Sequence, residues 1–464
     1  MTGASGYRNL NSGALANVGS NGNYWSFASN SQTNARNLNF NSGGVNPLNT
    51  NNRANGFSVC PVRAFVEPGF LENYRNMKYK FDDIHTLVAL AYIKSREHER
   101  SSNASLAFEL DEERNIRNLA GELYRREWKP GPLDWFVNTY PTVREIFSPK
   151  KRDRIVSHVL FGLISPVFER YFIYDSFSCR EGKGTLQGIE RFEHGLRGVT
   201  DNYTRDAWVL NLDISGYFMS INRKKLYEII WYSLGKYQMR HPDELDYDFI
   251  DYLLRTFLER DPLEGCRFVG KHYLCPLVKP EKSLRFQPPG VGLPIGDVIN
   301  QLNSNIYLNP FDQYVKRQLK VRYYYRYVDD ARLLHQSRDY LEHCRDLSAE
   351  FLDKQLGLKL HPKKTTITNA FETNIFLGAA IKPHRSYASN TSIVRFRQYI
   401  RQLDASIASG EPIDAELELS RINSRLGYFG HFDERKMVYK ILYSAPHVRS
   451  VYSFDKSLQK ARLI

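Results

Sequence analysis

Outside its first 76 residues the chain carries apolar side chains at the three-to-four-residue spacing that is typical of helices. This pattern predicts helices over residues 81–100 and 110–128, and two more over residues 392–408 and 413–432. The last two helices have basic faces, and their cations are Arg395, Arg397, Arg401, Arg421 and Arg425.

A different pattern, of apolar and aromatic runs without helical spacing, marks two places as strands. Residues 208–212 form such a run and lead into Asp213, and residues 323–334 form two runs around the pair Asp329-Asp330. The second pattern predicts a β-hairpin with two carboxylates at its tip. An isolated Asp-Asp pair is typical of a solvated turn, because adjacent carboxylates repel each other unless a cation lies between them.

The third carboxylate changes this interpretation. Asp213 follows an apolar strand of its own, so the sequence holds two acidic sites that are carried by strands. Two such sites are what a two-metal phosphoryl-transfer centre requires. The sequence therefore indicates a phosphoryl-transfer site formed by Asp213, Asp329 and Asp330.

Two polar segments offer contacts for phosphate groups. Four of the residues 150–154 are Lys or Arg, and a strand is predicted to begin at Ile155. Such a cluster suits a triphosphate or a nucleic-acid backbone, and a solvated basic turn fits it equally well. Residues 288–297 are rich in Gly and Pro and run into an amphipathic helix. A glycine-rich loop at the start of a helix can seat a base pair or a phosphate, and by itself it is only a helix cap.

The composition of the chain indicates which kinds of binding partner it favours. The 464 residues carry a formal net charge of +13, which suits a polyanion, and nucleic acid is the first candidate. Apolar runs fall short of the ~20 residues of a membrane span, and no signal peptide is recognisable, so no membrane partner is expected. The five cysteines are scattered, which argues against a zinc site and favours a reducing, cytoplasmic location.

The first sixty residues differ from the rest of the chain. They contain fifteen Asn and no Asp, Glu or Lys, and the first acidic residue is Glu67. Gly, Ser and Asn favour turns and offer little apolar surface to bury, so residues 1–76 are predicted to form a disordered or loop-rich leader.

The order of these pieces resembles the sequential motifs of reverse transcriptases. The matching segments are residues 147–156, 178–185, 208–218, 288–301, 323–334, 356–365 and 375–378. The resemblance covers roughly residues 77–464 and implies an α/β (α+β) right-hand polymerase. Its expected parts are N-terminal helices and fingers (77–207), a ferredoxin-like palm (208–384) with an insertion at about 222–287, and a helical thumb (385–464).

The resemblance also implies roles for individual residues. Asp213, Asp329 and Asp330 match the catalytic, metal-binding carboxylates, with the carbonyl of Ile214 as a further ligand for two Mg²⁺ ions, for which Mn²⁺ is a substitute. Phe218 matches the steric gate that selects deoxynucleotides, although its spacing by itself favours a core residue.

Further roles concern the nucleotide. Lys150 and Arg154 match the finger residues that grip the triphosphate, in a run of cations that leaves the register open. Lys363 or its neighbour Lys364 matches the lysine that protonates the leaving pyrophosphate. A last set matches the loop beneath the nascent base pair, namely Ile295, Gly296 and Gln301.

Ile295 departs from the Gln that most reverse transcriptases carry in this loop. An apolar residue there, followed by Asn300-Gln301, resembles the form found in diversity-generating retroelements, which implies low-fidelity copying at adenines for mutagenic retrohoming. The implied partners are a template RNA, the RNA/cDNA duplex, dNTPs and a small basic accessory variability protein. Alternatives are a retron, abortive-infection or group II intron enzyme, and a catalytically dead nucleic-acid-binding polymerase fold.

The same resemblance implies an origin for the Asn-rich leader. Asn codons carry adenines at their first two positions, and randomising these adenines never creates a stop codon. An Asn-rich stretch is therefore what a template repeat looks like when it is translated. We expect residues 1 to about 65 to be read-through of such a repeat and the working enzyme to begin near Met77.

Overall fold

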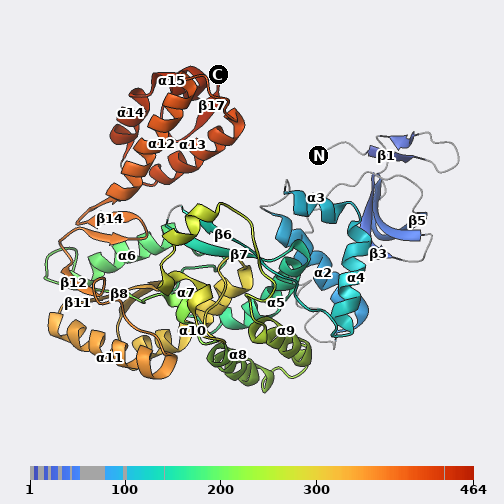
Figure 1. Ribbon diagram of the computed structural model, residues 1–464, viewed down its shortest axis with the longest axis horizontal. Coiled ribbons are helices and arrows are strands. Elements are labelled where there is room, and N and C mark those ends of the chain that lie inside the picture. Colours follow the sequence, from blue (N-terminus) through green and yellow to red (C-terminus); the bar gives the residue numbers. More distant parts are fainter. Residues whose placement is uncertain are drawn as a thin grey trace. The chain divides into compact units, whose positions relative to one another are not determined.

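The computed structural model describes residues 79–97, 102–139, 142–432 and 434–464, and the backbone of five earlier strands (Figure 1). Those strands are β1 Ser5–Arg8, β2 Leu15–Val18, β3 Gly22–Ser29, β4 Asn34–Asn41 and β5 Gly44–Asn52. β1 pairs with β2, and β3, β4 and β5 form an antiparallel sheet in that order. The sequence pattern does not predict these strands, and the remainder of the expected leader lies outside the described residues.

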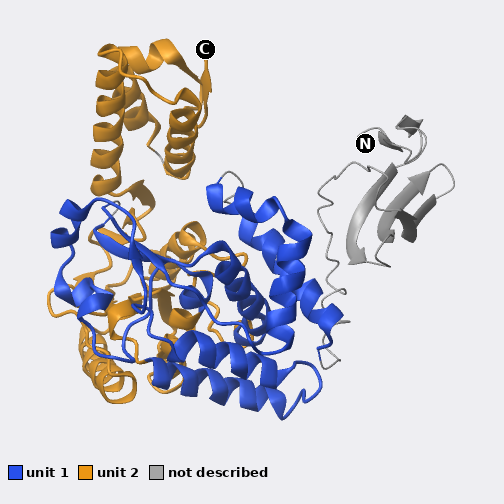
Figure 2. Cartoon of the chain, turned by 45° about the vertical axis from the view of Figure 1, so that its right-hand side comes forward, with its two compact units in different colours: residues 1–168, 223–302 blue, residues 169–222, 303–464 orange. Residues whose placement is uncertain are grey.

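The chain forms two compact units that interleave along the sequence (Figure 2). The first unit comprises residues 1–168 and 223–302, and the second comprises residues 169–222 and 303–464. The expected finger and palm segments each contribute to both units, and the division into leader, fingers, palm and thumb stays a prediction.

In the first unit, the elements that follow residue 79 are at first helices. The helix predicted over residues 81–100 is α2 Phe81–Arg96, and the one predicted over residues 110–128 is α4 Glu112–Tyr124, preceded by the short α3 Asn103–Glu109. The apolar positions of α2 and α4 are buried, as their spacing predicts, at Ile84, Val88, Tyr92, Ile116, Leu119 and Leu123.

The rest of the first unit combines helices with a small sheet. Its elements are β6 Asp134–Asn138, β7 Arg144–Ser148, α5 Lys151–Glu169, α8 Arg223–Gln238, α9 Tyr247–Glu259, β9 Arg267–Phe268, the 3-10 turns η2 His272–Leu277, η3 Pro280–Lys282 and η4 Leu284–Phe286, and the start of α10 Val298–Arg317. The sheet order is β7-β6-β9. The strand predicted to begin at Ile155 is wrong, because this residue lies inside α5, where buried Ile155, Val159 and Leu163 share one helical face.

A four-stranded antiparallel sheet organises the second unit. Its order is β10 Tyr323–Tyr327, β11 Asp330–His335, β8 Trp208–Asp213 and β12 Thr366–Asn369. The helices α6 Thr185–Val199 and α11 Arg338–Leu356 both contact this sheet and lie on opposite sides of it in Figure 1. The short helix α7 Tyr217–Ser220 follows β8 directly. Both predicted strand segments and the hairpin are thereby confirmed.

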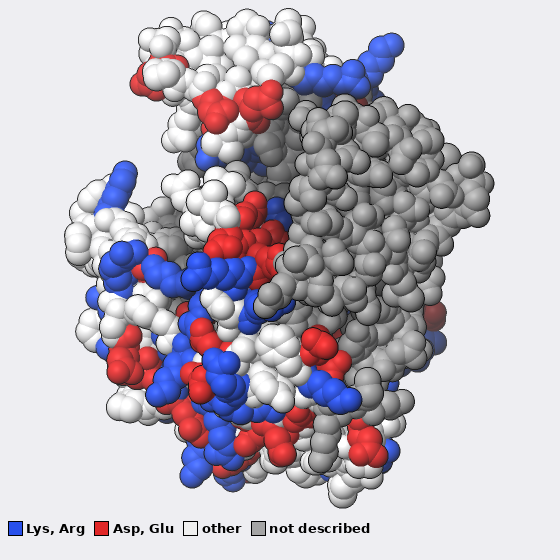
Figure 3. Space-filling view, turned by 90° about the vertical axis from the view of Figure 1, so that its right-hand side faces the viewer, with Lys and Arg blue, Asp and Glu red and all other residues white. Residues whose placement is uncertain are grey.

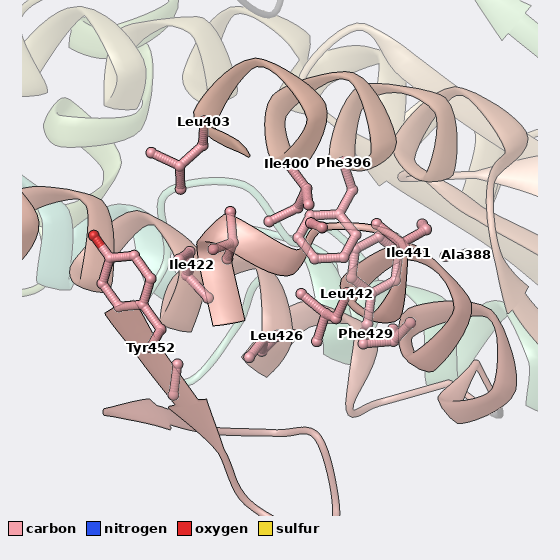
Figure 4. Close-up of a cluster of buried hydrophobic side chains, with 14 residues drawn as sticks. Ala388, Phe396, Ile400, Leu403, Ile422, Leu426, Phe429, Ile441, Leu442 and Tyr452 are labelled. Atoms are coloured by element: carbon pink, nitrogen blue, oxygen red, sulfur yellow. The ribbon is translucent and has the colours of Figure 1, made fainter. Parts of the chain in front are cut away.

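The C-terminal part of the second unit has its own core. It contains β13 Asn374–Phe376, β14 Ala379–Lys382, β15 Arg385–Ala388, α12 Asn390–Ala408, α13 Ala415–Phe429, α14 Arg435–Tyr443, α15 Pro446–Val451, β16 Tyr452–Phe454 and β17 Ala461–Leu463. Figure 4 shows the side chains of Phe396, Ile400, Leu426 and Leu442 directed into one buried cluster. The two predicted thumb helices are confirmed as α12 and α13, with ends shifted by up to three residues.

A buried ion pair lies beneath the acidic hairpin. Arg326 on β10 is 1% exposed, and its guanidinium donates to both carboxylate oxygens of Asp312 on α10, at 2.7 and 2.6 Å. Tyr324 donates a further hydrogen bond to Asp312 at 2.8 Å. A buried charge must be fully paired to be tolerated, so this network ties β10 to α10.

Removing one partner of this pair should be strongly destabilising. We expect Asp312→Ala to leave Arg326 buried without its counter-ion and to lower the free energy of unfolding by about 3 to 5 kcal/mol. Urea denaturation followed by circular dichroism measures this. The matched control is Glu350→Ala in the exposed Lys354–Glu350 pair, which should leave the urea midpoint unchanged. Equal midpoints for the two variants would contradict the assignment.

Candidate active site

The three predicted carboxylates meet at one end of the four-stranded sheet, within the second unit. Asp213 is the last residue of β8 and Asp330 is the first residue of β11, and the two are direct cross-strand partners. Asp329 precedes Asp330 in the turn of the β10–β11 hairpin. The expectation that these distant residues come together is therefore confirmed, while their metal-binding role stays a prediction.

The hairpin turn has an unusual backbone. Val328 adopts φ +54°, a left-handed conformation that β-branched residues rarely adopt. Its carbonyl accepts a hydrogen bond of 2.9 Å from Nη1 of the buried Arg326. The Arg326–Asp312 network thus holds the strained turn that presents Asp329.

Burial and mutual repulsion raise the pKa values of the hairpin carboxylates. Burial is the larger cause for Asp329, and the charges of Asp213 and Asp330 add to it, so that the pKa of Asp329 lies at about 6. The pKa of Asp330 is also raised by burial, and the nearby Arg332 guanidinium opposes that shift. A cation near these groups would favour their charged forms.

Two basic side chains already lie against these carboxylates. The Nζ atom of Lys364 lies 2.6 Å from Oδ2 of Asp213, and Arg332 on β11 forms an ion pair with Asp330. Lys364 reaches Asp213 because its segment is tied to the end of β8, where the backbone N–H of His361 donates to the Asp213 carbonyl at 2.7 Å. Of the two lysines that the sequence singled out, the structure brings Lys364 rather than Lys363 to the carboxylates.

The donor set fits a divalent cation. Carboxylate oxygens are hard ligands that Mg²⁺ and Mn²⁺ prefer, and like-charged carboxylates in a buried position are stabilised by such an ion. Within the described residues, no group of three or more His, Cys, Asp or Glu side chains is arranged to hold a metal as it stands. Asp213 and Asp330 are instead paired with Lys364 and Arg332, so metal binding requires these carboxylates to change partners.

Phe218 lies close to the acidic end of β8. It belongs to the four-residue helix α7, between the buried Tyr217 and Met219, and is itself only partly buried. Tyr217 donates a hydrogen bond to the carbonyl of Ser304, which anchors α7 from its buried side. The partial exposure of Phe218 is consistent with a role at a ligand rather than in the core.

Ile214 directly follows Asp213 in the second unit, and its side chain is buried. The predicted nucleotide-binding residues other than Phe218 lie in the first unit, and several of them meet there. The backbone N–H of Phe147 donates to the carbonyl of Ile295 at 2.7 Å, which joins the end of β7 to the Gly/Pro-rich loop. Gly296 has φ +132°, and a methyl group on it would lie 2.7 Å from the Phe147 carbonyl oxygen, so only glycine fits. Gln301 lies farther along, in the first turn of α10.

Of the predicted triphosphate-binding cations, Lys150 directly precedes α5 and Arg154 lies in its first turn. Lys150 is paired with Asp134, which also accepts hydrogen bonds from Arg267. Arg154 donates to the Ser148 hydroxyl at 2.8 Å. One turn later, the Ser157 hydroxyl donates to Asp297 at 2.5 Å. Burial raises the pKa of Asp297 to about 6.

Sequence reasoning missed Arg326, Arg332 and Asp297. The signal that could have found the two arginines is their position, since each interrupts an apolar strand next to the acidic pair. A charged residue at such a position must be buried with a partner, and the nearest candidate partners are acidic. Asp297 carries no comparable signal in the sequence.

The charge of the chain is mixed on the surface. On the face drawn in Figure 3, Lys and Arg side chains alternate with Asp and Glu. No helix in the described part of the chain is long and apolar enough to cross a membrane.

Comparison with known proteins decides the family. The model of the family described as reverse transcriptase (RNA-dependent DNA polymerase) matches residues 140–381, which is more than half of the chain and contains all three carboxylates. The chain belongs to the reverse transcriptase family. It is therefore an RNA-directed DNA polymerase, a nucleotidyltransferase of a class that uses divalent metal ions and RNA templates.

Individual relatives are distant from this reverse transcriptase. Protein YkfC of Escherichia coli (strain K12) is 25% identical over 313 residues, which is 60% of this chain and 74% of YkfC. Apo telomerase of Candida tropicalis, truncated from its C-terminal domain, has 13% identity over 56% of this chain, with a TM-score of 0.36. Telomerase of Candida albicans, in complex with a fragment of telomeric RNA, has 11% identity over 73%, with a TM-score of 0.41. The matches span 55% and 60% of those two telomerase chains. Structural similarity at this level gives no information about the substrates or partners of this reverse transcriptase.

Arg332 should act through Asp330. Its guanidinium also donates to the Ile375 carbonyl at 3.1 Å and lies 5.1 Å from the ring centroid of Phe376, so it links the carboxylate to the β13–β14 hairpin. We expect Arg332→Met to lower kcat of primer extension about 10- to 100-fold, as loss of a residue that orients a metal ligand does.

Steady-state primer extension at increasing Mg²⁺ concentration measures this effect. The matched control is Arg345→Met, which removes an exposed arginine paired with Asp346 on α11 and should leave kcat unchanged. Arg332→Lys should recover part of the loss because it keeps the charge near Asp330. Wild-type turnover in Arg332→Met would remove this residue from the site.

Proposed function

We propose that this reverse transcriptase copies a template RNA into cDNA with low fidelity at adenines, for mutagenic retrohoming by a diversity-generating retroelement. The observation that carries the proposal is Ile295, an apolar side chain at the loop position where the family resemblance leads one to expect Gln.

The geometry of the loop supports a ligand-facing role for this side chain. The Ile295 carbonyl is held by the Phe147 N–H, and Gly296 packs so closely on Phe147 that the backbone has little freedom. Leu293, two residues earlier, is 1% exposed, whereas Ile295 is only partly buried. An apolar side chain on a fixed backbone, incompletely covered by its own unit, is suited to lie against a base pair.

Such a side chain weakens discrimination between correct and incorrect nucleotides. A site that makes hydrogen bonds to its substrate rejects a mismatched one strongly, because the mismatch leaves polar groups unpaired. Ile295 offers no hydrogen bond, so only shape and base pairing orient the template base and the incoming nucleotide. Lower fidelity follows from the loss of that one interaction.

The other predicted residues supply the polymerase chemistry. Asp213, Asp329 and Asp330, with the Ile214 carbonyl, would hold Mg²⁺ or Mn²⁺. When bound, these ions would supply activation of the 3′-hydroxyl and compensation of the negative charge on the leaving pyrophosphate. Phe218 excludes a 2′-hydroxyl from the sugar site. A lysine of the 363–364 pair donates a proton to the leaving group, and the contact of Lys364 with Asp213 favours Lys364.

The remaining contacts concern substrates and partners. Lys150 and Arg154 bind the triphosphate of the dNTP by charge and hydrogen bonds. The template RNA and the RNA/cDNA duplex are the polymeric substrates. A small basic accessory protein is proposed as a partner from the family resemblance.

Restoring the missing hydrogen bond should raise fidelity. We expect Ile295→Gln to lower misincorporation opposite template adenine about fivefold, the effect of one hydrogen bond of about 1 kcal/mol. Sequencing of cDNA made on a defined RNA template measures the error at each template base.

Ile295→Leu is the matched control for this experiment, because it keeps an apolar side chain and should keep the wild-type error spectrum. Misincorporation at adenines that is the same in Ile295→Gln and wild type would refute the role of Ile295. It would leave the reverse transcriptase activity itself untouched.

The leader should be dispensable for catalysis. If residues 1 to about 65 are translated template repeat, a protein that begins at Met77 keeps the palm, the loop and the C-terminal helices intact. We expect its rate of primer extension to equal that of the full chain. A folded variant without activity would show that the leader belongs to the enzyme.

A further inference from the structure

The outward face of α14 consists of basic and aromatic residues alone. Its exposed positions are Arg435, Lys436, Tyr439, Lys440 and Tyr443, whereas Val438, Ile441 and Leu442 are directed into the C-terminal core. We call the exposed set, together with the neighbouring Arg449, the α14 face. Sequence analysis assigned basic faces to α12 and α13 and did not single out this helix.

The aromatic residues of the α14 face form a stacked ladder. The rings of Tyr439 and Tyr443 lie 4.6 Å apart between centroids with an interplanar angle of 28°. The guanidinium of Arg449 lies 4.4 Å from the ring centroid of Tyr443. Tyr439 and Tyr443 remain 47% and 56% exposed, so a flat ligand can extend this ladder from solvent.

The cations of the α14 face differ from those of α13. On α13, Arg421 is paired with Glu418, and Arg425 covers the ring of Tyr399 at 4.0 Å. Lys436 and Lys440 of α14 have no ion pair among the described residues, so their charge is available to an external anion.

We propose that the α14 face binds an unpaired segment of RNA, as a site separate from the active centre. Bases of the segment stack on the ladder of Tyr439 and Tyr443, and its phosphates contact Lys436 and Lys440. Stacking on exposed aromatic rings beside basic residues is the recurrent way in which proteins hold single strands. This inference rests on the part of the proposed function in which the enzyme copies an RNA template. It does not depend on the proposed low fidelity at adenines.

Two other occupants fit the α14 face less well. The bases of an RNA/cDNA duplex are stacked on each other, so a duplex could use the lysines but not the tyrosine rings. An acidic protein segment would likewise use the charges alone. The adjoining rings and cations therefore favour a single strand.

Fluorescence anisotropy with a labelled 12-nucleotide single-stranded RNA tests the proposal on the full chain. An excess of blunt RNA/DNA duplex is present to occupy the active site. We expect Tyr439→Ala/Tyr443→Ala to weaken binding at least about 5- to 150-fold, since the loss of a single stacked base costs on the order of 1–3 kcal/mol. We expect Lys436→Gln/Lys440→Gln to reduce the slope of log K against log salt by about 1.4, because two phosphate contacts are lost.

Conservative and distant variants separate stacking from a loss of folding. Tyr439→Phe/Tyr443→Phe keeps the rings and should keep wild-type affinity, and every variant should keep wild-type primer extension. A comparable exposed pair on α8, Tyr232 with Lys236 at 4.0 Å from its ring centroid, supplies the control Tyr232→Ala/Lys236→Gln, which should change nothing.

Three results would overturn the proposal. The first is unchanged single-strand affinity in Tyr439→Ala/Tyr443→Ala. The second is an equal loss of affinity for the RNA/DNA duplex in the absence of competitor, which would assign the α14 face to the product duplex. The third is an effect of the lysine variant alone, which would indicate a general anion-binding surface such as one for an acidic protein.

Discussion

The acidic end of the four-stranded sheet depends on the buried ion pair between Arg326 and Asp312. Two charges buried this deeply are tolerated only because nearly every donor and acceptor is used. Arg326 contacts Asp312 through two nitrogens, and its remaining nitrogen donates to the backbone carbonyl of Val328 and to the side-chain amide oxygen of Asn305. The strained turn that presents Asp329 is thus supported by an interaction inside the core, well away from solvent.

A second constraint follows from the sheet register. Because Asp330 lies directly opposite Asp213, the antiparallel pairing brings like charges together at the strand ends. The chain provides its own counter-charges there, with Arg332 on the strand of Asp330 and Lys364 on the segment that is hydrogen-bonded to the end of β8. These cations explain how the fold accommodates three carboxylates, and they define what a metal ion has to displace or share.

The same reasoning separates two kinds of basic residue in this chain. Arg326, Arg332 and the arginines of α13 are engaged by acidic or aromatic neighbours and serve the fold or the site. The lysines of α14 have no such partner among the described residues, and they adjoin exposed tyrosines. A net charge of +13 therefore says little about where a polyanion binds until the internal pairs are known.

The sequence by itself determined the elements and the family resemblance, because helical spacing, apolar strands and the order of short motifs are local properties. It identified α2, α4, α12 and α13, the β10–β11 hairpin and the three catalytic candidates Asp213, Asp329 and Asp330. It misread Ile155, since a short apolar run fits a strand and a buried helix equally well. Only the tertiary structure decided which charges are paired, namely Arg326 with Asp312, Arg332 with Asp330 and Lys364 rather than Lys363 with Asp213. Such pairs join residues that are far apart in the chain, or they depend on the direction in which a side chain points. The free energy of such a pair is set by its burial and not by the local sequence pattern.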